Sequence, residues 1–418
     1  MKIDFIKKHR YFIFLTIFFL TLLPFTLFSP AQTDTRAIVT GLSIDKENEQ
    51  FNLALQLITP QSNLSNNENL QVVEDRGKTL YECVNNLGIK LGKTVGFEHT
   101  NIIIIGETLF DEDLMNVLDF FYRNSKITLS TILVHCKGTA KDLLETSAEL
   151  NNNSSSSLQN NLGYNSTIIE TTNTTTLGTF FNEYYSFSGV SLIPVIEPPE
   201  KGKEQESGNS QSKQNGESSG ESSSSGQSGQ SGNKVEPLVI NNGEGAVYRK
   251  GKFIEIISRD LTNGFGWTRL HTTDGLILVE NVTDNKYFSG STVSIDVEHS
   301  KTKIKPRIEN DKLILNVNLK LYCIVSEISQ NEQKSKVIME SSETYLTDEL
   351  KQKTIEKVKN LVNDSLNYSK EKNVDILGFY DIYYKKNNKE FRKYLSKFGQ
   401  EYLQNCEIDL QVQVYPFT

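Results

Sequence analysis

Thr100–Gly106, with the sequence TNIIIIG, is a run of four isoleucines that ends at a glycine. An uninterrupted apolar run of this length is typical of a strand buried on both faces of a sheet. Leu129–Cys136 (LSTILVHC) has the same character. Helical patterns stand before, between and after the two runs, and buried strands that alternate with helices predict a layered α/β-like arrangement.

The helices expected around these strands are amphipathic. In the first of them, Leu80, Val84, Leu87 and Leu91 recur at helical spacing, which places them on one face. The chain before it alternates apolar and polar residues in two stretches joined by a short polar turn, the pattern of a β-hairpin. We therefore expect a hairpin over Arg36–Asp45 and Phe51–Thr59, and helices over Thr79–Leu91, Leu109–Arg123 and Thr139–Leu150.

Three carboxylates stand together near the start of the second expected helix: Asp111, Glu112 and Asp113. They resemble a metal-binding cluster, but carboxylates in a first helical turn also complement the helix dipole, and we favour that interpretation. His99 and His135 lie at the edge of, or inside, the two apolar strands. We interpret both as hydrogen-bonded structural residues and not as metal ligands.

Residues 201–233 differ in composition from the rest of the chain. Of these 33 residues, 26 are Gly, Ser, Gln or Asn and none is hydrophobic. Such a segment cannot bury enough surface to offset its ordering entropy, so it is expected to be disordered. Val190–Glu197, expected as a strand with an edge proline at Pro194, precedes it, and Leu238–Arg249 follows it; each has a strand pattern that needs a sheet partner. A loop inserted within one domain is therefore favoured over a linker between two domains.

The C-terminal part combines strands with two long helical patterns. Leu350, Ile355, Val358, Val362 and Leu366 recur at spacings near four, and lysines 351, 353, 357 and 359 form the solvated face of that helix. The expected strands are Lys252–Ser258 in a hairpin with Leu238–Arg249, and then three or four strands over Leu276–Val282, Ser291–Thr302, Lys303–Glu309 and Lys312–Val325; the stretch Leu261–Leu270 between them holds the only tryptophan, Trp267.

A basic, aromatic helix is expected from Glu390 to Leu403, between Ile376–Tyr384 and Glu407–Tyr415. Its aromatic residues could stack on nucleic-acid bases, but their spacing near four makes a core stripe the better interpretation. The stripe consists of Phe391, Tyr394, Phe398 and Tyr402.

Tyr11–Phe28 (YFIFLTIFFLTLLPFTLF) has no charged or amide side chain and follows a short basic head. It is long enough for an uncleaved membrane helix, with the head in the cytoplasm and the body exported. Cleavage as a signal peptide after Ala31 is the alternative. Thioether lipidation near this segment is excluded because the first cysteine is Cys83.

Length and charge set the remaining limits. A chain of 418 residues predicts two to three domains, and a formal net charge of −8 argues against nucleic acid or anionic lipid headgroups as the main partner of the body. Cys83, Cys136, Cys323 and Cys406 lie far apart, so four buried thiols are favoured over a disulfide. No H-E-x-x-H, P-loop or dinucleotide-binding motif is present. We expect no enzyme, no catalytic, cofactor-binding or metal residues, and we assign no ligand-binding residues.

The expected fold class is α+β: mixed or antiparallel sheets packed against helices in a multi-domain ectodomain, after an N-terminal membrane segment. The expected divisions are residues 1–31 for the head and membrane segment, 32–150 for an N-terminal α/β-like domain, 151–280 for a middle domain with a disordered insert at 200–234, and 281–418 for a C-terminal α+β domain.

Four stretches taken in order resemble the Ger(x)C family, the C subunits of spore germinant receptors. They are Arg36–Asp45 (RAIVTGLSID), Gly96–Gly138, Ser300–Pro306 (SKTKIKP) and Asn373–Gly378 (NVDILG) with the helix after it. Family members are lipoproteins, and the stretch before Arg36 departs from that pattern because it has no cysteine. Tryptophans that the family usually carries in its C-terminal helix are replaced here by Phe391 and Phe398.

The resemblance implies a non-enzymatic receptor subunit that supports assembly and signalling in spore germination. It also implies two partners, a multi-pass subunit and a transporter-like subunit, on the outer face of the inner spore membrane, with residues 11–28 in that membrane. The alternative is a membrane-anchored extracytoplasmic binding protein for a small solute or a wall fragment.

Overall fold

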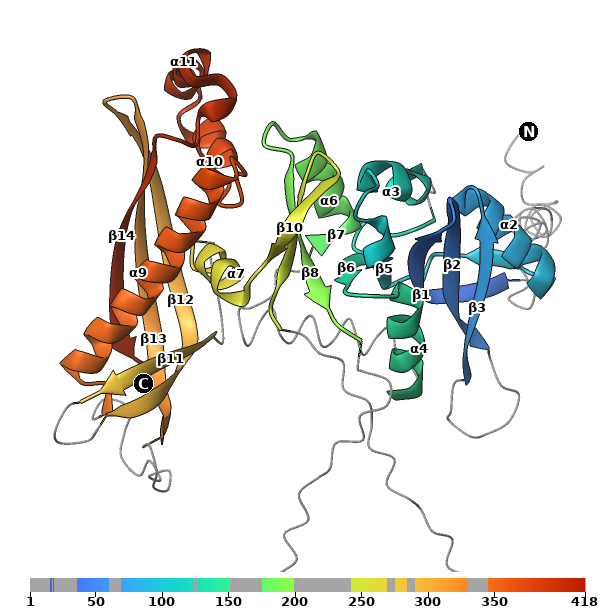
Figure 1. Cartoon of the computed structure of the whole chain (residues 1–418), viewed down its shortest axis with the longest axis horizontal. Coiled ribbons are helices and arrows are strands. Elements are labelled where there is room, and N and C mark those ends of the chain that lie inside the picture. The colour runs from blue at the N-terminus through green and yellow to red at the C-terminus, as the bar shows by residue number, and fades with distance from the viewer. Residues whose placement is uncertain are drawn as a thin grey trace, which may run out of the picture.

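Two β-sheets lie along an elongated molecule, one in each half of the chain (Figure 1). The structure is a computed structural model, and it describes residues 16, 18, 36–59, 69–123, 126–150, 175–198, 242–268, 275–283, 290–329 and 345–417. In chain order its elements are β1 Arg36–Glu47, β2 Gln50–Thr59, β3 Asn69–Gly77, α2 Leu80–Leu91, β4 Thr94–Gly96, β5 Ile102–Gly106, η2 Glu107–Leu109, α3 Leu114–Arg123, β6 Ile132–Cys136, α4 Ala140–Leu150, β7 Thr175–Thr176, α6 Leu177–Tyr185, β8 Val190–Ile196, β9 Gly245–Arg249, β10 Lys252–Ile257, α7 Arg259–Gly266, β11 Gly275–Val282, β12 Ser291–Glu309, β13 Lys312–Ser329, α9 Asp348–Glu371, α10 Phe379–Lys386, α11 Asn388–Phe398, η3 Gly399–Glu401 and β14 Cys406–Pro416.

The first sheet has ten strands and is mixed. Its order is β10-β9-β8-β6-β5-β1-β2-β3, with β4 beside β1 and β7 beside β6. β1, β5, β6 and β8 run parallel to one another, while the hairpins at both ends are antiparallel. The expected α+β class is confirmed. The sheet also continues past residue 150, because β7 to β10 join it.

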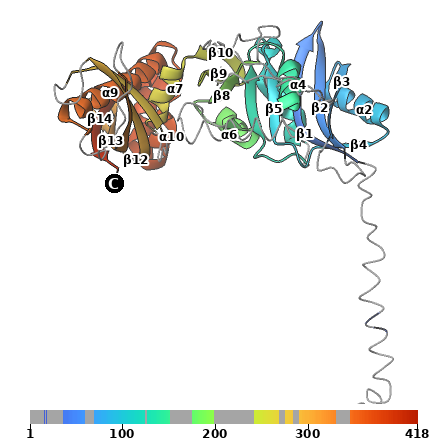
Figure 2. The same cartoon turned by 90° about the horizontal axis from the view of Figure 1, so that it is seen from below.

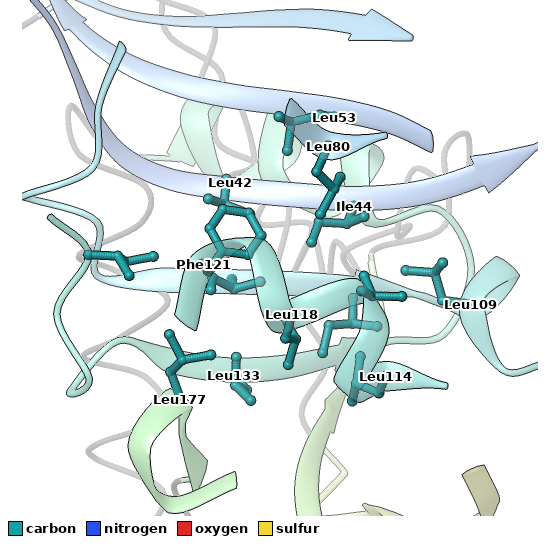
Figure 3. Packing of buried hydrophobic residues seen from close by; sticks show 14 of the residues in the cluster. Leu42, Ile44, Leu53, Leu80, Leu109, Leu114, Leu118, Phe121, Leu133 and Leu177 are labelled. Carbon is teal, nitrogen blue, oxygen red and sulfur yellow. The ribbon is translucent and has the colours of Figure 1, made fainter. Parts of the chain in front are cut away.

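The isoleucine run is buried on both faces, as its sequence predicts. Ile103 and Ile105 point into a core covered by α2, α3 and α6, whereas Ile102 and Ile104 point into a second core under α4. Successive strand residues face opposite sides of a sheet, so a run without alternation requires a helical layer on each face. Figure 3 shows the first of these cores, with Leu118 and Phe121 of α3 facing β1 and β5.

Three hairpins turn through pairs of residues with positive φ. The pairs are Asn48–Glu49, Lys250–Gly251 and Asn310–Asp311, with φ between 47° and 77°. Positive φ at both central residues is the signature of the type I′ turn, whose twist matches that of the flanking strands. The hairpins expected over β1–β2 and β9–β10 are confirmed.

The second sheet has four strands in the order β11-β12-β13-β14. β12 and β13 form a long antiparallel ribbon, and β14 returns parallel to β13. Of the three or four strands expected between Leu276 and Val325, the structure has three, since Ser291–Thr302 and Lys303–Glu309 form the single strand β12, which pairs with β13 as far as Glu309 opposite Lys312. Two bulges earlier in β12 bend the strand without ending it.

Two further expectations need correction. The helix predicted from Leu109 begins at Leu114, and the Asp113 carboxylate accepts a hydrogen bond from the Met115 backbone amide at 2.9 Å. Pro194 was expected in an edge strand, but β8 lies between β6 and β9. The proline is tolerated there because pairing with β6 begins only at Val195, so no ladder hydrogen bond from that side requires its missing N–H.

The expected membrane segment lies outside the described residues except for Thr16 and Phe18. Among the residues that the structure does describe, no helix is both long enough and apolar enough to cross a bilayer. The expected disordered insert likewise falls on residues outside the described ranges.

We predict that the low-complexity run is a loop within the first sheet. β8 and β9, which flank it, pair with each other from Val190 opposite Arg249 to Pro194 opposite Gly245. Replacing residues 201–233 with a four-residue Gly/Ser turn should therefore leave the melting temperature and the cooperativity of unfolding unchanged, because each doubling of loop length costs only about 0.6 kcal/mol of closure entropy. Thermal unfolding measures both quantities.

The control is a chain split at the run into two fragments. Each fragment lacks the partner of its terminal strand, so neither should fold separately. Cooperative unfolding of both isolated fragments would contradict the loop interpretation.

Candidate functional site

The two sheets meet through one shared hydrophobic core, and we take this junction as the candidate functional site. Strand β8 contributes side chains to two cores. Ile193 and Val195 belong to the core of the first sheet, whereas Val190 and Leu192 belong to the core that is shared with the C-terminal half. The shared core holds Val190, Leu192, Val247, Ile257 and Phe265 from the first half, and Leu313, Leu315, Val317, Leu366, Tyr368, Val374, Ile376, Leu377, Phe379, Tyr383, Phe391, Tyr394, Tyr402, Leu403 and Cys406 from the second.

The aromatic stripe expected on the C-terminal helix belongs to this core. Phe391, Tyr394 and Tyr402 are buried, and Phe398 packs against them. Phe391 and Tyr402 meet edge to face with ring centroids 6.3 Å apart, a favoured arrangement for aromatic pairs. The core-stripe interpretation is confirmed.

A close contact between α7 and α9 forms one wall of the junction. A Cβ atom on Gly264 would lie 2.0 Å from the Leu361 carbonyl oxygen, so only glycine permits this approach. The Ser365 hydroxyl donates a hydrogen bond to the Leu261 carbonyl at 2.8 Å. The two helices are therefore held backbone against backbone.

Asp375 organises the other wall. One carboxylate oxygen accepts the backbone N–H of Phe379, and the second accepts the N–H of Tyr380, both at 2.8 Å. The second oxygen also accepts the Tyr402 hydroxyl at 2.7 Å. These bonds satisfy amides at the start of α10 that have no partner within the helix, and they tie α10 to the segment before β14.

Asp375 is only 5% exposed. Its burial raises its pKa above the usual range, while the three hydrogen bonds that it accepts oppose that rise. Burial, followed by the neighbouring Asp375 charge, raises the pKa of Tyr402. Tyr402 is therefore held as a neutral phenol that donates to the carboxylate.

The rim of the junction joins the halves through side chains. Lys372, just after α9, pairs with Glu255 of β10 at 3.0 Å. Phe187, after α6, stacks on Tyr380 of α10 with ring centroids 4.4 Å apart and planes 11° apart. Both contacts are partly exposed, so they can break and re-form at a lower cost than the buried core.

A cleft of about 410 Å³ opens between α6 and α10 beside this core. Its polar lining comes mainly from the first half, with Thr179, Asn182, Glu183, Ser186 and Ser188, and from α10 with Asp381. The described lining contains carboxylates and no lysine or arginine. This chemistry suits neutral or cationic polar solutes better than anions.

His135 lies inside the first sheet, on β6, and is not part of the cleft lining. Its ring stacks on Phe110 with centroids 4.4 Å apart, and its Nδ1 lies 3.3 Å from the Tyr248 hydroxyl. Burial lowers the pKa of His135 to about 3, so it stays neutral. His99 is exposed and precedes β5, at the opposite end of the parallel strands.

The three carboxylates before α3 do not converge. Glu112 pairs with Lys46, and Asp113 caps the helix. In the part of the chain that the structure describes, no three His, Cys, Asp or Glu side chains are close enough to hold a metal ion. The four cysteines are buried free thiols, which confirms the favoured expectation.

Sequence reasoning did not single out Asp375 or Gly264. A signal for Asp375 was present, since it is the one charged residue in the apolar stretch Val374–Tyr380. An isolated carboxylate in such a stretch indicates burial with dedicated donors. Gly264 offered no comparable signal, because its neighbour Leu361 is almost a hundred residues away.

This architecture defines a two-sheet α+β protein whose halves share one core, without a converged catalytic set among the described residues. Family models match both halves: the spore germination protein N-terminal domain over residues 31–198, and the C-terminal domain described as spore germination B3/GerAC-like over residues 243–415. The chain belongs to this Ger(x)C family, as the resemblance predicted.

Relatives of known name agree with this assignment. Spore germination protein B3 of Bacillus subtilis is 26% identical over 298 residues, covering 69% of this chain and 67% of the relative. Spore germination protein KC of the same organism is 21% identical over 401 residues, covering 91% and 88%. The crystal structure of the GerBC protein matches 90% of this chain and 97% of its own at 17% identity, with a TM-score of 0.50, and it supports the fold.

We predict that Asp375→Ala destabilises the C-terminal half. The change leaves two backbone amides and one phenol without an acceptor, and should cost about 2–4 kcal/mol of the free energy of unfolding. Tyr402→Phe removes one of the three donors and should cost about 1 kcal/mol. Urea unfolding measures both.

The matched control is Asp381→Ala, on α10, the helix that Asp375 precedes. Asp381 is exposed and pairs with Lys385 at 3.6 Å, so its loss should cost less than about 1 kcal/mol. Equal costs for Asp375→Ala and Asp381→Ala would refute the role given to Asp375.

We further predict that Gly264→Ala forces α7 away from α9. The added methyl group meets a backbone carbonyl that cannot rotate aside, and overpacking of this kind costs about 1–3 kcal/mol. Asp260→Ala, at an exposed position of α7, should change stability by less than about 0.5 kcal/mol. Thermal unfolding compares the two variants, and indistinguishable melting temperatures would contradict the close contact.

Proposed function

We propose that this chain is a non-enzymatic subunit of a nutrient germinant receptor complex, where it supports receptor assembly and signalling. The carrying observation is the family match over both halves, residues 31–198 and 243–415. The two Bacillus subtilis relatives are named spore germination proteins. Membership of a common family supports a common role.

The proposed setting is the extracytoplasmic face of a membrane, the inner spore membrane in a sporulating host. Residues 11–28 would anchor the chain there, because their composition suits a membrane helix and the basic head before them stays in the cytoplasm. The proposed partners are a multi-pass subunit and a transporter-like subunit of the receptor.

The proposed mechanism uses the junction between the two sheets. A partner that binds one relative orientation of the halves more tightly than another shifts the population of orientations. The shared core resists small rotations, while the Lys372–Glu255 pair and the Phe187–Tyr380 stack at its rim can change partners. Such a junction switches between discrete arrangements of the two halves more readily than it deforms continuously.

The non-enzymatic part of the proposal rests on what the titratable side chains do in the fold. His135 packs among aromatic rings, Glu112 and Asp113 bind neighbouring groups, and Asp375 holds backbone amides. Each of these groups has a structural partner that accounts for its position.

The second candidate is an extracytoplasmic binding protein for a small solute or a wall fragment. The cleft of about 410 Å³ between α6 and α10 favours it, since its volume and polar lining fit a small polar molecule. In that case the cleft, and not the partner subunits, would carry the function.

The test is purification of a tagged copy of the full chain from spore membranes, together with a germination assay of the deletion strain. We expect the multi-pass and transporter-like subunits to co-purify, and germination with one or more nutrients to fail in the deletion strain. Complementation with the wild-type gene and with Asp260→Ala should restore it. Complementation with Gly264→Ala should not, at equal protein level.

Two outcomes would contradict the receptor proposal. One is recovery of the chain without either partner subunit. The other is normal germination of the deletion strain with every nutrient tested. Binding of a solute that is lost in Asn182→Ala, with normal germination, would favour the second candidate.

A further inference from the structure

The outer face of the second sheet, turned away from α9, carries a basic stripe. We use this name for Lys301, Lys303 and Lys305 of β12 together with Lys320 of β13. Strand residues two apart point to the same face, so the stretch Ser300–Pro306 places its three lysines in one row. Lys320 lies directly opposite Lys301 across the β12–β13 ribbon. All four side chains are exposed.

An aromatic row borders one end of the basic stripe. His299, Tyr322 and Tyr415 lie side by side on β12, β13 and β14. The Tyr322 ring stacks on His299 at 5.9 Å and on Tyr415 at 5.6 Å between centroids. The ammonium groups of Lys301 and Lys320 lie 5.6 Å from the Tyr322 and Tyr415 rings respectively, within the range of cation–π attraction.

The charges of the basic stripe are not neutralised within the described part of the chain. No described carboxylate lies within ion-pair distance of its four lysines, whereas the next cation along β12, Arg307, pairs with Glu309 at 3.4 Å. Asp409, on β14, is the exposed carboxylate nearest in register, opposite Asn316. A row of unpaired cations on a chain of net charge −8 is complementary to an anionic surface.

The basic stripe lies on the same side of the molecule as the start of β1, which favours a membrane as the anionic partner. β1 begins at Arg36, beside β4, and only seven residues lie between Phe28 and Arg36, so the two are at most about 29 Å apart. In Figure 2, β12 and β13 lie below α9, and β4 lies at the same lower side of the opposite end. The basic stripe and the start of β1 are therefore turned to the same side.

We propose that the basic stripe binds the anionic headgroup surface of a phospholipid bilayer. The inference rests on the membrane anchor of the proposed function, since residues 11–28 hold one end of the molecule at the bilayer and the basic stripe contacts it at the other end. On this sheet face the lysines can contact lipid phosphates, and the bordering tyrosines suit the interface between water and lipid.

Each lysine near an anionic bilayer strengthens binding about fivefold, and the attraction decays over one Debye length. The contact therefore weakens when salt is raised. The tyrosines add a contribution to the binding free energy that depends less on salt, because aromatic rings partition favourably to headgroup depth whatever the charge of the lipid.

The test places a fluorophore on the full-length chain at Asn318→Cys, an exposed position opposite Lys303. The native cysteines are buried, and burial raises the pKa of Cys83 to about 11, so the new thiol reacts selectively. The labelled protein is reconstituted in vesicles of phosphatidylcholine alone, or of phosphatidylcholine with phosphatidylglycerol, each containing a headgroup spin-labelled lipid as quencher.

We expect strong quenching only with phosphatidylglycerol, and its loss at high salt. Lys303→Glu/Lys305→Glu should weaken the contact more than tenfold. The matched control Lys357→Glu/Lys359→Glu makes the same change in net charge on α9, away from this face, and should leave quenching unchanged.

Three results would overturn the proposal: equal quenching in both lipids, equal loss in both double variants, or no quenching in either vesicle. If quenching is absent and Lys303→Glu/Lys305→Glu instead loses the receptor partners on purification, the face binds protein and not lipid. Sedimentation with the vesicles of phosphatidylcholine alone reports on the anchor separately, so failure of the anchor is distinguishable from failure of the basic stripe.

Discussion

The arrangement of the two halves depends on one buried carboxylate and the core around it. Asp375 holds the first amides of α10 and the Tyr402 hydroxyl, and this fixes the aromatic residues that pack against β8. A buried charge is costly unless its hydrogen bonds are made. The cost therefore selects one packing of α10 and α11, and with it one orientation of the second sheet against the first.

The other wall of the junction depends on a glycine because that position has no room for a side chain. Gly264 allows α7 to contact α9 through backbone atoms, while Ser365 binds the Leu261 carbonyl. The junction thus combines a rigid core, a close helix contact and a rim of exchangeable pairs. This combination suits the signalling role proposed above, and the polar cleft lies where relative movement of the halves would change its shape.

Charge is distributed unevenly over the molecule, so that one face of the second sheet is basic although the chain as a whole is acidic. Composition alone shows an acidic chain and argues against an anionic lipid partner for the body as a whole. The fold separates the charges, because strand alternation sends the lysines of Ser300–Pro306 to one face while carboxylates elsewhere pair with cations. Net charge therefore describes the average field of the molecule, and the field at one face can have the opposite sign.

Local patterns in the sequence determined most of the elements. The β1–β2 hairpin, α9 and the aromatic stripe from Phe391 follow the repeat of two or 3.6 residues with which burial recurs on a strand or helix, and the isoleucine run Thr100–Gly106 lacks alternation because it is buried on both faces. Only the tertiary structure decided that β12 continues past Thr302, that β8 lies inside its sheet, and that Asp375 and Gly264 form the junction. Those features depend on partners distant in sequence, and no local pattern records which distant residue will be in contact.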